Sequence, residues 1–570
     1  MKRLISVLLV VLLVPVLFIG CKGETTTQTD TDSDTETQVS NTEITEQTSE
    51  EAAEAGASTE TGGLINSPVT EEDFAAYDAI DSGLYNYEPD STTNDYDGDI
   101  VIVQANDMIT FDTTVTTLLY NADIQYEIYS RLFVATPENE YVPELCKSYE
   151  RVSDTEWHFT IYSGVKFHDG SELTIDDVVY SLNRAKDSAM MKNLYAPVVS
   201  ITKLDDESLC IITDGPYPGL TAALGHSASS ILSQEYTEWC IANDDWSKPI
   251  GTGRYKFDSR EIGDYVKLVR FDDYFNQDDP ARNASLTIKV IPEATARTIA
   301  VETGEADVNV DFSTADYERV LSEGELKIWV RNGGTPHGLG MDVTQEWLDN
   351  ELVRQAISYA VDRESCLEVG YDGLGIVTYS PLAPHCIGYV NNPLDMYSYN
   401  VEKAKELMAE ANCTGFDTEL IVISSTDEKV AVVIQANLAE IGINVEIVRI
   451  EASVFTATVL EHGAPLYINN WGCFRDPDLF IGRRFGTVGL GAANRNWFAT
   501  DELDAMIVEA RSTFDEEERA EYYKAIQEYL AVEMPEAELY VPDLFTLTSK
   551  DIKGVVINHD RPYRYYSLHF

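Results

Sequence analysis

The order of apolar and polar positions predicts alternating strands and helices along most of the chain. Short apolar runs at 100–103 and 157–161 predict strands. Behind the second run, Thr174 and Asp177 have the spacing of a helix capping box, and an apolar stripe at helical spacing follows through Ala185. These patterns predict a mixed α/β protein.

The clearest unit lies between residues 400 and 450. Asn400 is expected to cap one helix, and the apolar run 420–423 predicts a strand. A helical stripe from 430 to 441 and a second apolar run at 445–448 follow. Strand, helix and strand at this spacing predict a βαβ unit with parallel strands. No G-x-G-x-x-G motif accompanies it, so nucleotide binding has no support.

The N-terminus has the pattern of a secretory signal. A basic start at 1–3 precedes an apolar stretch at 4–19, which is too short for a comfortable membrane span. Its end, Leu17-Phe18-Ile19-Gly20-Cys21, resembles a bacterial lipobox, which predicts a signal peptide over 1–20 and a lipid on Cys21. The alternative is an ordinary signal peptide with an incidental cysteine.

A strongly acidic segment follows the signal. Residues 23–63 contain no aromatic residue and no Lys or Arg, so they cannot bury enough apolar surface to fold. We expect residues 21–97 to form a lipid-anchored acidic disordered tether, with 64–97 packing loosely on the folded part. The formal net charge of −58 argues against nucleic acid as a partner.

The candidate chemistry is sparse. Seven cysteines follow Cys21, none in a C-x-x-C pair, which predicts scattered buried thiols and no metal or cofactor site. No G-x-S-x-G or H-E-x-x-H motif is present, so the protein is not expected to be an enzyme. A hydrolase built on a pair of carboxylates stays open, because acidic residues are so numerous.

Five segments in register resemble one family. They are GVKFHDGSELTIDDVVYSLNRA (164–185), PIGTGRYKF (249–257), IPEATARTIAVETGEADV (291–308), VRQAISYAVDRE (353–364) and IKGVVIN (552–558). Together they resemble the substrate-binding proteins of bacterial ABC importers, the oligopeptide-, dipeptide- and nickel-binding class known as solute-binding protein family 5. The resemblance covers about residues 100–570.

The resemblance implies a two-lobed periplasmic-binding-protein-like fold with a hinge and an extra domain inserted in the first lobe. By analogy, lobe I comprises 98–135, 250–330 and 538–570, the extra domain 136–249, and lobe II 331–537. The segment Pro249–Gly253 then lies near a crossover, where glycine can absorb backbone rotation or simply serve a turn. The resemblance further implies that ligand is held between the lobes of a monomer on the outer face of the cytoplasmic membrane.

Peptide binders of this family carry a Trp and then an anchoring Asp before an Asp-Pro step. Here the stretch is YINNWGCFRDPDLF, 467–480, in which Cys473 stands where that Asp would be. The candidate ligand-binding residues are Asn469, Asn470, Trp471, Cys473, Phe474 and Arg475. Amide and aromatic groups suit neutral polar ligands, whereas Arg475 suits an anion if it faces inward. Alternatively, Arg475 pairs with Asp476 or Asp478 and faces solvent.

The first lobe is expected to contribute Thr116 and Tyr120. Family members present an extended edge in this region to peptide-like ligands, a form of strand addition. The threonines and tyrosines of 113–120 fit that role, and they also fit an ordinary edge strand.

The expected function is capture of a peptide or similar polar solute and its delivery to the permease of an ABC importer. The open alternatives are an oligosaccharide binder, a ligand-sensing receptor of the same fold, a metal-chelate carrier and a secreted hydrolase.

Overall fold

A computed structural model describes residues 84–85, 96–116, 118–136, 140–188, 194–557 and 564–570. The predicted signal peptide, Cys21 and nearly all of the predicted tether lie outside the described residues. Along the described ranges, no helix has both the length and the apolar character needed to span a membrane.

Most strands belong to one mixed sheet of 13 strands among the described residues, with the central order β17-β16-β18-β14-β19-β12-β2-β11-β10-β9. They are β1 (Leu84–Tyr85), β2 (Asp99–Gln104), β9 (Tyr255–Glu261), β10 (Tyr265–Arg270), β11 (Ser285–Val290), β12 (Val308–Asn309), β13 (Lys327–Asn332), β14 (His337–Met341), β15 (Gly375–Val377), β16 (Phe416–Val422), β17 (Ile443–Arg449), β18 (Leu466–Asn470) and β19 (Glu536–Thr548).

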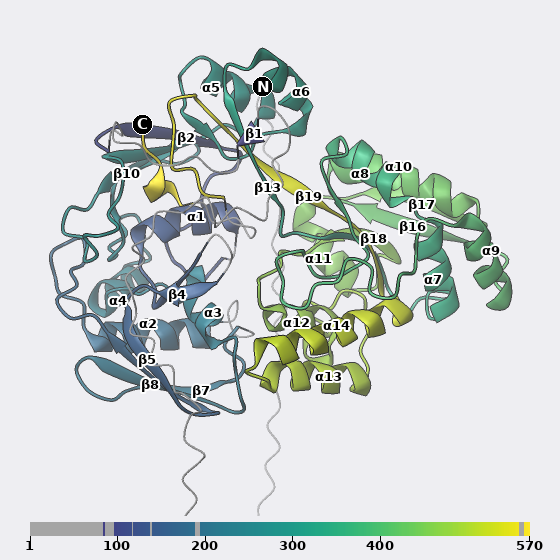
Figure 1. The fold of residues 1–570 in the computed structure, drawn as a ribbon, viewed down its shortest axis with the longest axis horizontal. Helices are drawn as coiled ribbons and strands as arrows, with labels where there is room; N and C mark the ends of the chain where they lie inside the picture. The colour runs from purple at the N-terminus through teal and green to yellow at the C-terminus, as the bar shows by residue number, and fades with distance from the viewer. Residues whose placement is uncertain (1–83, 86–95, 117, 137–139, 189–193, 558–563) are drawn as a thin grey trace, which may run out of the picture. The chain divides into compact units, whose positions relative to one another are not determined.

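The long strand β19 joins two halves of this sheet. Its first half pairs with β14 and β15, and its second half pairs with β13 and β12. In Figure 1, β19 is the yellow strand that runs from the neighbourhood of β18 to that of β13. The chain crosses the same boundary a second time at 333–336, between β13 and β14.

The chain between β2 and β9 forms two smaller sheets. Strands β3 (Phe133–Ala135) and β4 (Tyr141–Pro143) make a hairpin. The other sheet has the order β5-β6-β8-β7, from β5 (Cys146–Ser153), β6 (Glu156–Ile161), β7 (Val198–Lys203) and β8 (Ser208–Thr213). Its inner face packs on a core that includes Trp157, Phe159 and Leu182.

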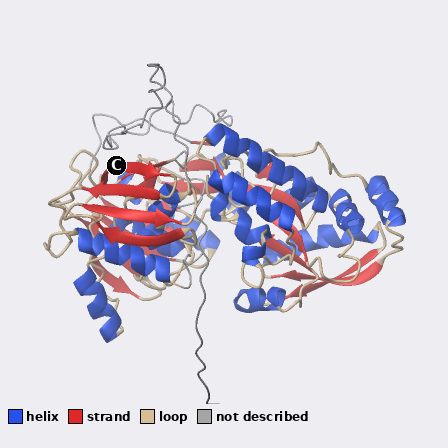
Figure 2. Cartoon of the chain, turned by 90° about the horizontal axis from the view of Figure 1, so that it is seen from below, coloured by secondary structure: helices blue, strands red, loops and turns tan. Residues whose placement is uncertain are grey.

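Helices pack against the strands, as Figure 2 shows. The α-helices are α1 (Leu119–Ile128), α2 (Ile175–Asp187), α3 (Leu220–Gly225), α4 (Gln234–Asn243), α5 (Ala294–Glu302), α6 (Tyr317–Glu323), α7 (Glu351–Ala360), α8 (Arg363–Tyr371), α9 (Val401–Glu410), α10 (Ser425–Ala439), α11 (Ala452–Leu460), α12 (Ile481–Phe485), α13 (Asp501–Ser512) and α14 (Glu516–Glu533).

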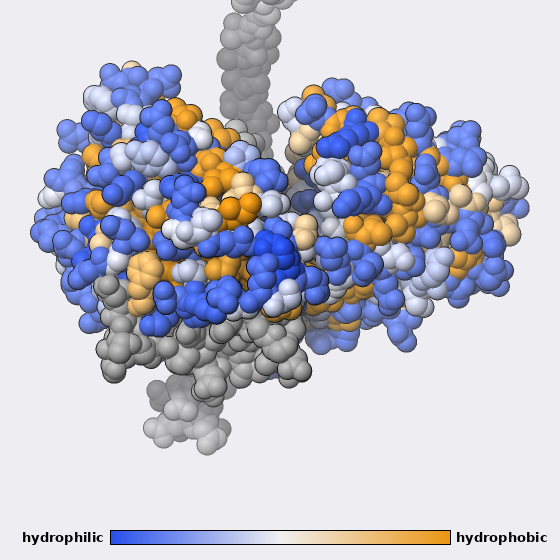
Figure 3. Space-filling view, turned by 90° about the horizontal axis from the view of Figure 1, so that it is seen from above, coloured by the Kyte–Doolittle hydropathy of each residue, from blue (hydrophilic) through white to orange (hydrophobic). Residues whose placement is uncertain are grey.

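The local sequence signals are confirmed. Thr174 and Asp177 form a reciprocal capping box at the start of α2, and Asn400 caps α9. Strands β16 and β17 are parallel neighbours joined through α10, as the βαβ prediction requires. All seven cysteines of the described part are buried and have free thiols. Figure 3 shows a face dominated by hydrophilic residues, as the high content of acidic residues leads one to expect.

One strand lies inside the segment predicted as a disordered tether. Leu84–Tyr85 forms β1 and pairs in parallel with Ile328 and Trp329 of β13. Close to the folded part, Arg270 also forms an ion pair with Asp97 at 2.9 Å. The folded part therefore begins before residue 97, within the segment predicted as tether.

The glycines of the predicted crossover have a packing role. A Cβ atom on Gly251 would lie 2.1 Å from the carbonyl oxygen of Ile128, and one on Gly253 would lie 2.5 Å from that of Glu127. Glycine is therefore required because the backbone passes close to the end of α1. This reason is independent of any hinge motion.

A carboxyl group is buried at the same place. Burial raises the pKa of Glu127 from 4.5 to about 8, although Arg254 and backbone N–H groups oppose the shift. Its Oε1 accepts a hydrogen bond from the N–H of Tyr565 at 2.8 Å. Because the folded pKa exceeds the unfolded one, the stability contributed by this group is fully present below pH 4.5 and is lost as pH rises through about 8.

We expect Glu127→Gln to weaken this pH dependence, because the amide keeps an acceptor for Tyr565 and cannot ionise. The measurement is the free energy of urea unfolding of both proteins at several values across this pH window. The variant should gain stability relative to the wild type as pH rises. Two results would contradict the raised pKa of Glu127. One is that the free energies of unfolding of wild type and variant change in parallel with pH. The other is that the exposed control Glu305→Gln gains as much stability as Glu127→Gln.

Candidate ligand-binding site

The predicted site residues lie at the end of β18 and in the loop that follows it. Strand β18 pairs with β14, with Asn470 opposite His337. The N–H of Trp471 then donates to the carbonyl of Pro336 at 3.1 Å, and the N–H of Cys473 donates to that of Gly334 at 2.8 Å. The loop is therefore attached to the connection between β13 and β14.

Three polar groups of this region have no partner in the described structure, and one of them is the fully buried hydroxyl of Tyr467. The side chain of Asn469 is nearly buried and accepts a hydrogen bond from Arg495 at 2.5 Å, but its Nδ2 is unpaired. The indole Nε1 of Trp471 is also buried and unpaired. The neighbouring Asn470 is exposed. Buried donors without partners are costly, so Asn469 and Trp471 are groups that a ligand can satisfy.

Two arginines lie over the indole ring. The guanidinium carbons of Arg484 and Arg495 lie 5.9 Å and 5.1 Å from the centroid of Trp471. Cation–π contacts at these distances hold the ring in one orientation. The indole is therefore positioned before any ligand arrives.

Cys473 lies in the interior. Its side chain is fully buried and packs in a core cluster with Leu382, Cys386 and Phe480. Its Sγ lies 3.7 Å from the carbonyl oxygen of Pro381. In this conformation the position that carries the anchoring Asp in the family's peptide binders points away from solvent.

We expect Cys473→Asp to destabilise the protein by roughly 3 kcal/mol or more, because it buries a carboxylate beside Glu538. The measurement is the free energy of urea unfolding, with Cys473→Ser as a neutral polar control. The outcome that contradicts this expectation is a stable Cys473→Asp variant that acquires affinity for peptides with a free amino group.

Phe474 and Arg475 face another part of the chain. The ring of Phe474 lies 5.9 Å from that of His226, which caps the short helical turn after α3. Arg475 lines a cavity of about 340 Å³ that also contacts Tyr141, Thr221 and Glu516. This cavity is bounded by the β3–β4 hairpin, α3, the loop and α14.

Arg475, Asp476 and Asp478 each form an ion pair with a residue outside the loop. Arg475 contacts Glu516 with both terminal nitrogens, at 2.9 and 2.5 Å. Asp476 instead pairs with Arg519 at 2.6 Å, and Asp478 pairs with Arg511 at 2.7 Å. The alternative that Arg475 pairs with Asp476 or Asp478 is therefore wrong, because arginines from α13 and α14 occupy both carboxylates.

The segment 113–120, predicted to form an extended edge of the first lobe, is not extended throughout. Tyr120 lies in the first turn of α1, which begins at Leu119, and Thr116 is buried, with its hydroxyl accepting a hydrogen bond from the N–H of Leu118. The prediction of a strand-like edge through residue 120 is therefore wrong. Among the described residues, Thr116 and Tyr120 form no hydrogen bond or ring contact with the Trp471 loop; the Thr116 hydroxyl bonds locally to Leu118.

A buried charge cluster behind Trp471 was missed by sequence reasoning. Arg484 is fully buried and contacts Glu536 at 3.0 Å and Glu538 at 2.6 Å. Burial raises the pKa of Glu538 well above its ordinary value, Arg484 opposes the shift and Glu536 adds to it. The sequence contained one signal for this cluster: Glu536 and Glu538 stand at alternate positions of an apolar strand, so both point to the same face.

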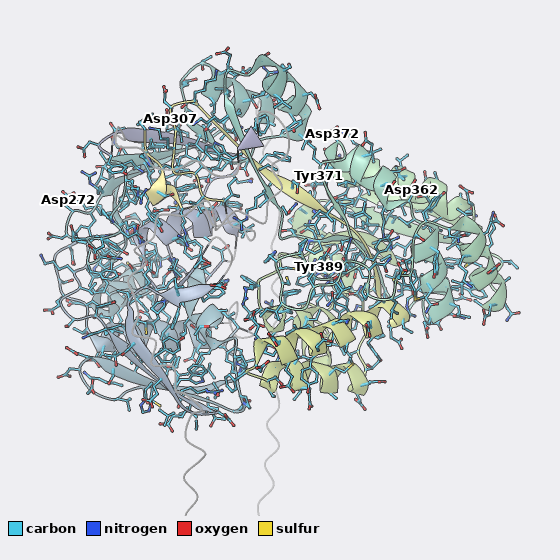
Figure 4. The ribbon with its side chains drawn as sticks, in the orientation of Figure 1. Asp272, Asp307, Asp362, Tyr371, Asp372 and Tyr389 are labelled. Atoms are coloured by element: carbon cyan, nitrogen blue, oxygen red, sulfur yellow. The ribbon has the colours of Figure 1, made fainter. Side chains whose placement is uncertain are left out.

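An aromatic cluster flanks the same strand. The ring of Tyr540 stacks on His337 at 5.2 Å and meets Tyr371 edge-on at 5.5 Å. Figure 4 labels Tyr371 at the end of α8 and Asp362 at its N-cap. Burial lowers the pKa of His337 to about 4, so its imidazole is neutral at physiological pH.

This two-lobed α/β architecture, with a partly unsatisfied polar loop, is that of a solute-binding protein. Residues 140–489 match the family described as bacterial extracellular solute-binding proteins, family 5. The chain belongs to this family, whose members are extracytoplasmic binding proteins and not enzymes.

Three similar proteins illustrate the family. The chain is 28% identical over 472 residues to heme-binding protein A of Haemophilus influenzae, covering 77% of this chain and 85% of that protein. It is 25% identical over 474 residues to the dipeptide-binding protein of Escherichia coli, covering 77% and 86%. The periplasmic binding protein DppA of Helicobacter pylori, solved with the peptide STSA, superposes with a TM-score of 0.74 at 24% identity, covering 83% of this chain and 98% of that one.

Proposed function

We propose that this protein captures a small peptide or a similar polar solute between its two lobes and delivers it to the permease of an ABC importer. It acts as a monomer, attached through a lipid on Cys21 to the outer face of the cytoplasmic membrane. The family supports solute binding, and the lipobox at 17–21 supports the anchor.

The ligand is held chiefly by neutral polar and aromatic groups. The observation that carries this proposal is the pair of unpaired buried donors, Asn469 Nδ2 and Trp471 Nε1. Asp476 and Asp478 are already paired with arginines, and Cys473 is buried, so the loop has no carboxylate free to bind an α-ammonium group. A carbonyl-rich ligand such as a peptide backbone matches two donors.

The remaining candidate residues surround this pair. Asn470 offers a solvent-exposed amide, Arg475 lines the cavity, and Phe474 lies beside His226. Thr116 and Tyr120 belong to the opposite lobe and would meet the ligand on closure. Cys473 contributes by packing beneath the loop.

Lobe closure would take place about the two sheet crossings, residues 333–336 and the middle of β19. We propose the lobe boundaries given by the family analogy, with 136–249 as the inserted domain. Because the loop is hydrogen-bonded to Pro336 and Gly334, ligand contacts at Trp471 can influence a crossing segment directly. Ligand would favour the closed state by its greater affinity for it.

The test is thermal unfolding of the full chain against di- to hexapeptides with free or acetylated amino ends, oligosaccharides and nickel chelates. A binding ligand raises the melting temperature by mass action. We expect free and acetylated forms of the same peptide to give equal shifts. A shift that disappears on acetylation would refute the neutral pocket, and shifts by oligosaccharides alone would refute peptide as the ligand class.

The receptor alternative is tested separately. Deletion of the gene should abolish uptake of the identified ligand. Unimpaired uptake would contradict delivery to a permease and favour a sensing role.

A further inference from the structure

The outward face of the four-stranded sheet carries a cluster of metal-ligating side chains. Trp157, Phe159 and Ile161 of β6 point into the core, so Glu156 and His158 point outward. On β8, Leu209 and Ile211 belong to the same core, whereas Cys210 between them does not. Cys210 therefore lies on the face of Glu156 and His158.

Strand register brings these residues together. His158 and Cys210 are directly opposite each other in the antiparallel pair β6–β8. Residues in this relation have Cβ atoms about 5 Å apart and share one face of the sheet. Glu156 lies on the same strand and face as His158, two residues away, so two neighbouring strands hold all three side chains.

Their donor atoms converge. Nε2 of His158 lies 2.8 Å from Oε1 of Glu156, and Sγ of Cys210 lies 3.9 Å from the same oxygen. All three ligand atoms lie within 4.8 Å of one another. In a tetrahedral zinc site, normal bond lengths place nitrogen and oxygen ligands about 3.3 Å apart, and sulfur and oxygen ligands about 3.5 Å apart. Two of the three distances therefore lie within about half an ångström of a tetrahedral site, and the third, between Nε2 and Sγ, lies within 4.8 Å and must shorten toward about 3.5 Å.

The donor set selects the class of cation. Thiolate and imidazole ligands favour zinc and similar borderline metals over calcium or magnesium, which require oxygen ligands. The side chains of His158 and Glu156 are 34% and 38% exposed, so an ion can reach them from solvent. Glu150, which lies opposite His158 on β5, adds negative charge on the same face.

We propose that Glu156, His158 and Cys210 bind a zinc-class divalent cation, with water in the fourth position. The cation replaces the proton of the Cys210 thiol and connects β6 to β8. The site lies on the four-stranded sheet and shares no residue with the proposed ligand loop, so it does not depend on the proposed function.

The test uses the full chain after treatment with a chelator. Co²⁺ is added as a spectroscopic probe, and Zn²⁺ affinity is measured by competition with a chromophoric chelator. We expect one equivalent of Co²⁺ to produce a thiolate-to-cobalt charge-transfer band in the near ultraviolet, and Zn²⁺ to remove that band. Absence of the band in the folded protein would overturn the proposal.

Variants assign the ligands. Cys210→Ser should abolish the band, and His158→Gln and Glu156→Gln should each weaken Zn²⁺ binding by at least about tenfold. Cys146→Ser, whose thiol lies in the core of the same sheet, and Glu207→Gln, at the exposed β7–β8 turn, serve as matched controls. Circular dichroism confirms folding. The site would be refuted if the control substitutions weakened Zn²⁺ binding as much as the ligand substitutions, or if Cys210→Ser kept the full Zn²⁺ affinity.

Discussion

Replacing Arg484 with alanine is expected to lower the free energy of unfolding by about 3–5 kcal/mol, because it leaves Glu536 and Glu538 buried without their ion-pair partner. All three side chains are nearly or fully inaccessible to solvent in the wild type. Urea unfolding at pH 7, followed by circular dichroism, measures the loss. We expect this loss of unfolding free energy to be the largest caused by any single substitution proposed for this protein.

The pH dependence of this loss provides a second test. In the wild type the pKa of Glu538 is already raised, so its contribution to stability falls as pH rises through the folded pKa. Without Arg484 that pKa rises further, and the variant should lose more stability at high pH than at pH 5. Arg449→Ala, which removes an exposed ion pair with Glu428, is the control and should cost less than about 1 kcal/mol. An Arg484→Ala loss as small as the control's would contradict a buried ionic core.

Trp471→Ala is expected to weaken binding of the ligand identified in the thermal panel by roughly 30-fold or more, the effect of removing a central aromatic anchor. The substitution removes the unpaired Nε1 donor and the ring that Arg484 and Arg495 hold in place. Isothermal titration calorimetry measures the change in Kd. Trp471→Phe separates the two contributions, because it keeps most of the ring and removes the donor.

The matched control is Trp239→Ala. Trp239 is exposed on α4 and stacks on Tyr236, outside the proposed ligand loop. We expect the Trp239→Ala variant to bind the same ligand with the Kd of the wild type. If Trp471→Ala binds with unchanged affinity while its fold is intact, the loop is not the ligand site.

Local sequence signals located several of the elements. The capping box at Thr174 and the parallel βαβ unit at 416–449 are both present in the structure, because capping and periodicity act over a few residues. The edge predicted through Tyr120 failed because helix α1 begins at Leu119 without a capping side chain. No short-range signal marked that boundary.

The contacts of the proposed ligand loop were predicted only in part. The loop around Trp471 was found through its motif, but the partners of its charges were not. Arg475 pairs with Glu516, and Asp476 pairs with Arg519, in each case across some 40 residues of chain. Pairing at that distance depends on how α14 packs beside the loop, and the residues nearest in sequence gave the wrong partner.

By itself, the sequence determined the α/β alternation, the helix caps, the family motifs and the acidic character of the chain, because each depends on residue type and local spacing. Only the tertiary structure decided that Cys473 faces the core, that Arg484 contacts two glutamates of β19, and that His158 lies opposite Cys210. These features result from strand register and helix packing, which bring together residues that are distant along the chain.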